Sequence, residues 1–70
     1  MDKEKLLYDL IFSKKEDFII DISEYIDNIY EHKEFVDDIK NILKKSKVII
    51  IESDIILDLK TATWKIKIKK

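Results

Sequence analysis

Lysine alternates with large apolar residues in the last eight residues of the chain, TWKIKIKK. In a β-strand this period of two places Lys65, Lys67 and Lys69 on one face, about 6.7 Å apart, a spacing that suits contacts with the phosphates of a nucleic acid. Lysines also occur on exposed edge strands, because charge on an unpaired strand hinders pairing with another chain. We favour the edge-strand interpretation, with Trp64 and Ile66 packed in the core on the opposite face.

Catalytic chemistry has few candidate residues in this chain. His32 is the single histidine, whereas a metal site normally needs three or four ligands. No carboxylate shares its helix face to orient the ring, since its neighbours at helical spacing are Asn28, Ile29, Phe35 and Val36. The absence of glycine excludes the glycine-rich loops that cradle phosphates. We therefore expect a protein that is not an enzyme and needs no metal or cofactor, with His32 in a packed stripe or at its rim.

Opposite charges are separated along the chain. Residues 16–38 hold nine acidic residues and one lysine, a net charge of −8, whereas residues 39–70 hold nine lysines and three acidic residues, a net charge of +6. A solvated helix surface is the simplest explanation of the acidic run, and a docking surface for a basic partner is the functional one. We expect one compact unit with an acidic helical part and a basic sheet.

Two helices are predicted near the N-terminus. Leu6, Leu7 and Leu10 recur at helical spacing and predict a helix over residues 2–12. Ser13-Lys14-Lys15-Glu16 has the S-x-x-E spacing of a capping box, which predicts that a second helix, residues 14–30, begins there. The apolar stripe of this second helix would be Phe18, Ile19, Ile22, Tyr25, Ile26, Ile29 and Tyr30.

A third helix is predicted over residues 33–45, after a break near His32. The alternative is one continuous helix over residues 14–45, because the apolar stripe keeps its phase across this region. Such a helix would be about 45 Å long, which is too long for a compact chain of this size. We therefore favour two helices.

The C-terminal third predicts strands over residues 47–52, 55–60 and 63–69, because isoleucine dominates and the apolar period shortens toward two. They would form a small antiparallel hairpin or a three-stranded meander. Residues 52–54 are either a turn or a bulge in one longer strand, and residues 60–63 form the expected hairpin turn. The fold class is thus α+β, a single domain over residues 1–70 with the element order of a winged-helix protein.

Length and composition restrict the class of protein further. Seventy residues bury a thin core, and no cysteine is present to reinforce it. No apolar run approaches the roughly 20 residues of a membrane-spanning helix, and the N-terminus has no signal-peptide pattern. We expect a soluble, cytoplasmic protein that does not enter membranes. The lysine and isoleucine bias suggests AT-rich coding, as in a phage or mobile element.

By elimination, we expect a small binding protein that docks on another protein with a basic surface, for example as a phage inhibitor of a host defence system. The predicted contact is an acidic helical face of Asp21, Glu24, Asp27, Glu34, Asp37 and Asp38. One alternative is a winged-helix-like DNA-binding regulator that uses Lys40, Lys44, Lys45, Lys65 and Lys67. Another alternative is a structural homo-oligomer, with a homodimer as the smallest form.

Overall fold

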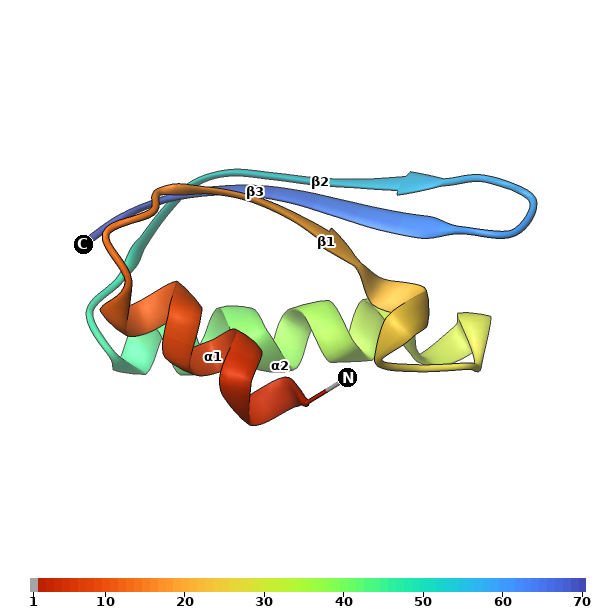
Figure 1. Cartoon of the computed structure of the whole chain (residues 1–70), viewed down its shortest axis with the longest axis horizontal. Helices are drawn as coiled ribbons and strands as arrows, with labels where there is room; N and C mark the ends of the chain where they lie inside the picture. Colours follow the sequence, from red (N-terminus) through yellow and green to blue (C-terminus); the bar gives the residue numbers. More distant parts are fainter. Residues whose placement is uncertain (1) are drawn as a thin grey trace.

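The computed structural model describes residues 2–70, apart from the side chain of Ile29. The elements are, in chain order, α1 (Lys3–Phe12), β1 (Asp17–Asp21), the short 3₁₀ helices η1 (Ile22–Glu24) and η2 (Ile29–Glu31), α2 (His32–Lys45), β2 (Ile49–Leu57) and β3 (Ala62–Lys69). They form two layers, with both α-helices on one face of a three-stranded antiparallel sheet (Figure 1). The α+β class is confirmed, but the predicted order of three helices and a hairpin is wrong.

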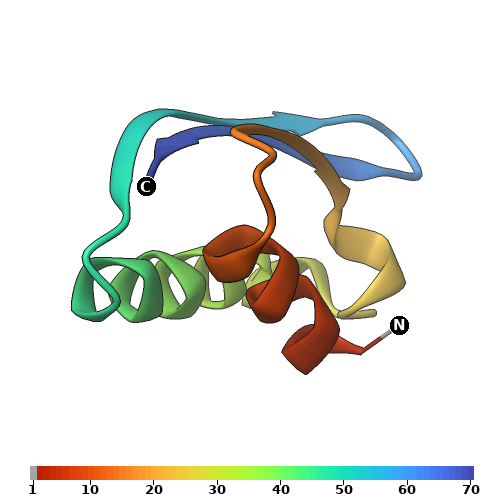
Figure 2. The ribbon, with the colours of Figure 1, turned by 60° about the vertical axis from the view of Figure 1, so that its left-hand side comes forward.

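The sheet has the strand order β1-β3-β2, so the last strand of the chain is its centre. Residue Ile66 of β3 lies between Phe18 of β1 and Ser53 of β2. The prediction that the C-terminal lysines mark an exposed edge strand is therefore wrong, because β3 is paired on both sides. Figure 2 shows that no helix covers the other face of the sheet.

The capping box at Ser13 does not start a helix. Ser13 instead ends α1, where its N–H donates to the carbonyl of Asp9 at 3.2 Å. Its hydroxyl accepts the N–H of Lys15 at 3.3 Å, and the carbonyl of Glu16 accepts the N–H of Ile68 at 2.8 Å. The serine hydroxyl that would have capped a helix start, together with the backbone of Glu16, thus helps to turn the chain from α1 into the sheet.

The predicted helix over residues 14–30 is replaced by β1 and two turns of 3₁₀ helix. In β1, Phe18 and Ile20 are buried while Ile19 between them is 72% exposed, which is the period of a strand. The run DFIID contains two adjacent isoleucines, and β-branched residues favour strands once a partner strand is available. Pairing with β3 supplies that partner.

The helix predicted over residues 33–45 is confirmed as α2, which begins at His32, one residue before the predicted start, and the alternative of one continuous helix over residues 14–45 is wrong. Glu31 precedes it without any side-chain capping bond, in agreement with the lack of a good cap in this region. The inward face of α2 carries the predicted stripe, with Phe35, Val36, Ile39 and Leu43 buried.

The C-terminal end of α2 closes with a Schellman motif that lacks glycine. The N–H of Val48 donates to the carbonyl of Leu43 at 2.9 Å, and the N–H of Lys47 donates to the carbonyl of Lys44 at 3.1 Å. Lys47 adopts a φ of 63°, a left-handed conformation that costs a side-chain-bearing residue about 1–2 kcal/mol. The tight turn places β2 directly after α2.

The predicted strands over residues 47–52 and 55–60 are one strand, β2, so the bulge interpretation of residues 52–54 was closer than the turn. The register shifts between Ile50 and Glu52, one residue before that segment, and leaves Ile51 without a partner on β3. The hairpin loop spans residues 58–61, where the N–H of Asp58 donates to the carbonyl of Thr61 at 2.9 Å. The predicted meander is wrong, because the third strand of the sheet is β1.

The core lies between the inner face of β3 and the two helices. Trp64 is fully buried, as expected, and its indole N–H donates to the Ser53 hydroxyl at 2.8 Å. Ile66 and Ile68 continue this face, and they pack in one cluster with residues of α1, β1 and α2. The alternation of lysine with apolar residues therefore reflects a strand that buries its apolar side in the core and exposes its lysines on the other face.

Substitution of Ile20 and of Ile19 distinguishes the strand from the predicted helix. We expect Ile20→Ala to lower the free energy of unfolding by about 2–5 kcal/mol, because Ile20 is in the core. Ile19→Ala should cost less than about 1 kcal/mol, since that side chain faces solvent. Urea unfolding followed by Trp64 fluorescence measures both values. A larger loss for Ile19→Ala would contradict the strand.

Tyr25 makes stability sensitive to alkaline pH. Burial raises the pKa of its hydroxyl, and Glu24, Asp9 and Asp2 raise it further by repelling the phenolate. The neutral form is therefore preferred in the fold, so this contribution is complete below about pH 10 and is lost as pH rises above it. Tyr25→Phe should flatten the fall in unfolding free energy as pH rises above about 10, measured by urea titration. An identical pH profile for both proteins would contradict this expectation.

Candidate functional site

The most exposed apolar surface follows the edge strand β2. Ten large hydrophobic residues of the described chain are exposed, and six of them belong to β2 or its loop: Ile49, Ile51, Ile55, Ile56, Leu57 and Leu59. β2 pairs with β3 on one side and has no strand on its other side. Its free edge therefore presents unpaired backbone groups together with isoleucine side chains.

The end of β2 and the hairpin loop extend beyond the helical layer (Figure 1). Ile55 is paired with the fully buried Trp64, yet it remains 40% exposed. Leu57, paired with Ala62 at the end of the strand, is 61% exposed, and Leu59 in the loop is completely exposed. The helices thus cover the core end of the hairpin and leave its tip uncovered.

Charges alternate across the open face of the sheet. Lys67 on the central strand lies between Asp17 of β1 and Glu52 of β2. Lys65 lies between Ile19 and Asp54 in the next row. The expectation of a basic sheet is therefore wrong, because strand pairing brings acidic residues from both neighbours beside the lysines. Each lysine is a cross-strand partner for carboxylates.

The structure divides the predicted acidic docking face. Asp21 ends β1, where its carboxylate accepts the N–H of Ser23 at 3.0 Å, and Glu24 and Asp27 belong to the turns that follow. The other three residues, Glu34, Asp37 and Asp38, are exposed on the first half of α2. These three share one helix face, and Glu34 lies in the first turn, where the helix dipole favours negative charge.

The lysines of the DNA-binding alternative lie on two sides of the molecule. Lys40, Lys44 and Lys45 belong to α2, which packs beneath the sheet, whereas Lys65 and Lys67 project from its open face. A duplex bound at one set would not reach the other through the sheet and core. The winged-helix arrangement, which needs a third helix and a wing on one surface, is absent from residues 2–70.

A shallow groove of about 490 Å³ joins α2 to the edge strand, and it is lined by Asp37, Lys40, Asn41, Lys44 and Ile50. The groove brings one residue of the predicted acidic face together with two lysines of the alternative. Charges of both signs therefore border β2 on its helical side.

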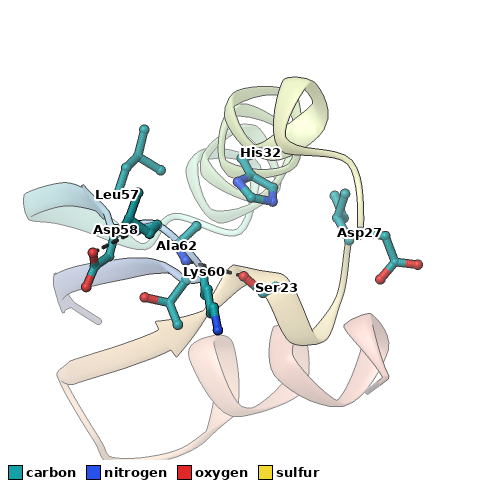
Figure 3. A pocket seen from close by; sticks show the side chains of 10 residues that line it. Ser23, Asp27, His32, Leu57, Asp58, Lys60 and Ala62 are labelled. Carbon is teal, nitrogen blue, oxygen red and sulfur yellow. Dashed lines mark hydrogen bonds between the residues drawn. The ribbon is translucent and has the colours of Figure 1, made fainter.

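Sequence reasoning missed a second feature, a cleft of about 250 Å³ under the hairpin loop (Figure 3). Its lining comes from the η1 region, the first turn of α2 and the loop itself, and consists of Ser23, Ile26, Asp27, His32, Leu57, Asp58, Leu59, Lys60, Thr61 and Ala62. His32 is 8% exposed, and both ring nitrogens are buried without a hydrogen-bond partner. The one signal for this site in the sequence is the single histidine between a polar segment and an apolar stripe.

Within residues 2–70, no three histidine, cysteine, aspartate or glutamate side chains are grouped so that they could hold a metal ion. None of the helices formed by these residues has the length and apolar character needed to cross a membrane.

Comparison with known proteins found no matching family model, no matching curated protein and no matching solved structure.

Reversal of one central lysine tests the charge rows of the open face. Lys67→Glu places three carboxylates side by side and should lower the free energy of unfolding by about 1 kcal/mol at low salt, with a smaller loss in 1 M NaCl. Lys69→Glu is the matched control, because Lys69 is paired with Ile49 alone. Equal losses for the two variants in urea unfolding would contradict the proposed pairing of charges.

Proposed function

We propose that this chain is a small, non-enzymatic binding protein that docks on another protein by accepting one of its strands along β2. The observation that carries the proposal is the free edge of a nine-residue strand flanked by exposed isoleucines. Strand addition satisfies the unpaired backbone groups of such an edge, and the alternate side chains of the partner supply specificity. A protein that acts in this way would inhibit or recruit its partner by occupying its surface.

The charge of the partner strand follows from the rows on the open face. From β1 to β2, one row has the order Asp17, Lys67, Glu52, and the next row ends with Lys65 and Asp54. A further strand beside β2 would place its side chains opposite Glu52 and Asp54 on this face. Opposite charges stabilise such cross-strand pairs and like charges destabilise them. The favoured partner strand therefore carries lysine or arginine at two alternate positions.

A second copy of this chain is a poor occupant of the same edge. In an antiparallel pair of β2 strands, overlap of all nine residues places Ser53 at the two-fold axis, so that Glu52 of each copy lies opposite Asp54 of the other. Four carboxylates would then meet at the centre of the interface. The bulge at Ile51 also disturbs the regular edge. The proposal is therefore a heterologous partner rather than a homodimer.

The acidic residues of α2 would attract the basic partner before it contacts β2. Glu34, Asp37 and Asp38 are exposed near the start of α2, and the groove between α2 and β2 includes Asp37. Exposed charge of one sign attracts a basic partner over a range of about 10 Å and raises its association rate. We assign the α2 acids to this attraction and the β2 edge to the contact.

A designed strand tests the proposal without knowledge of the natural partner. The probe is a seven-residue peptide in which lysine alternates with valine, and its control has glutamate in place of lysine. We expect the lysine peptide to shift the backbone amide signals of residues 52–57 in a ¹H–¹⁵N spectrum. Its affinity should fall with added salt, and the glutamate peptide should bind at least tenfold more weakly.

Two double variants separate the edge from the helix. Glu52→Lys with Asp54→Lys should reverse the preference in favour of the glutamate peptide, whereas Asp37→Lys with Asp38→Lys should change the affinity for the lysine peptide by less than threefold. Loss of binding in the second variant alone would place the contact on α2. Equal binding of both peptides to the unaltered protein, or no binding of either, would overturn strand addition at β2.

A further inference from the structure

The cleft under the hairpin loop contains a buried histidine whose hydrogen bonds are missing. Both nitrogens of His32 lack a partner among residues 2–70, although the ring is more than nine-tenths buried. A buried polar group without a partner destabilises the fold, so native structures rarely retain one without a function. Figure 3 shows the ring directed from α2 toward Ser23 and Ala62.

Two polar side chains of the cleft are engaged in bonds to backbone N–H groups. The hydroxyl of Ser23 accepts the N–H of Ala62 at 3.3 Å, and the carboxylate of Asp58 accepts the N–H of Leu59 at 2.7 Å. The cleft also contains the apolar side chains of Ile26 and Leu57. These side chains line the same cleft as an imidazole whose two nitrogens have no hydrogen-bond partner.

The shape and lining of the cleft restrict what could fill it. Its volume of about 250 Å³ equals that of about eight water molecules and lies below the range of drug-sized sites, so it suits one ring. The carboxylates of Asp27 and Asp58 line it together with the ammonium group of Lys60, so the lining carries one net negative charge and favours a neutral occupant over an anion. An apolar ring with one neutral polar group fits this lining.

A hydroxyl is the polar group that matches a histidine of either tautomer. It can donate to the bare imidazole nitrogen or accept from the protonated one, whereas an indole N–H can only donate. Both ring nitrogens are buried, and the broad χ2 torsion of histidine allows the ring to rotate so that one of them meets the hydroxyl. A phenol therefore supplies a partner for one of the two ring nitrogens of His32 and places its own ring against Ile26 and Leu57.

We propose that this cleft binds a phenol group and that the group is a tyrosine of the docked partner. The identity of the source depends on the proposed function, because Leu57 belongs both to the β2 edge and to the cleft. In a partner strand antiparallel to β2, the residue opposite Leu57 lies near the N-terminal end of that strand. Tyrosine at such a position has an apolar ring and a hydroxyl that is usually hydrogen-bonded when buried.

The first experiment uses p-cresol as the probe and toluene as its matched control, with the unaltered protein. We expect p-cresol to shift the amide signals of Ser23, His32 and Ala62 and the ring nitrogen signals of His32, with saturation in the millimolar range. Toluene should bind at least fivefold more weakly, because it cannot hydrogen-bond. Absence of saturable shifts, or equal affinity for both compounds, would overturn the proposal.

A variant and a peptide then test the role of His32 and the source of the phenol. His32→Phe should reduce the p-cresol affinity to that of toluene, and its urea unfolding curve shows whether it remains folded. An N-terminal tyrosine on the lysine–valine peptide should tighten binding at least threefold over alanine at the same position. If p-cresol binds but the tyrosine does not tighten peptide binding, the cleft binds a phenol and the proposal that this phenol is a tyrosine of the partner is overturned. If the peptide binds without p-cresol binding, strand addition stands and the phenol site does not.

Discussion

The rest of this structure depends on the antiparallel pairing of β3 on both sides. β3 is joined to β2 by a short hairpin, but it also pairs with β1, whose Phe18 lies beside Ile66 although 48 positions separate them in sequence. This pairing buries the apolar side of β3, including Trp64, against the helices. It also brings acidic residues of β1 and β2 beside the lysines on the other side. Core, open face and free edge all follow from it.

The free edge is a consequence of small size. Two helices of 10 and 14 residues are too short to cover a hairpin whose strands have nine and eight residues and which continues into an exposed loop. The uncovered part is apolar in Ile55, Leu57 and Leu59. A monomer gains nothing from exposed isoleucine and leucine at a strand edge, whereas a binding protein gains an interface from them. The phenol-sized cleft lies under the same overhang, so both proposed contacts belong to one end of the molecule.

Charge has a different role in this fold from the one that the linear sequence indicates. The acidic and basic halves of the chain are not two faces, because strand pairing interleaves Asp17, Lys67 and Glu52 in one row. Such pairing neutralises the open face and leaves Glu52 and Asp54 as the outermost charges next to the free edge of β2. In the proposed docking, those two residues favour a basic strand over a second copy of the chain. Specificity here would therefore come from the local order of charges rather than from a large dipole.

The sequence by itself determined the first helix, the helix from about residue 33 to Lys45, the strand character of the C-terminal third and the burial of Trp64. These features depend on contacts between near neighbours, which the apolar period records. The tertiary structure decided β1, the central position of β3 and the orphaned His32. Phe18, Ile19, Ile20 and Ile22 satisfy a helical and a strand period almost equally, and the choice depends on a ladder with residues 63–67 that no local pattern encodes. The free edge of β2 and the cleft under the hairpin loop could not be predicted for the same reason, since each is formed where segments distant in sequence meet.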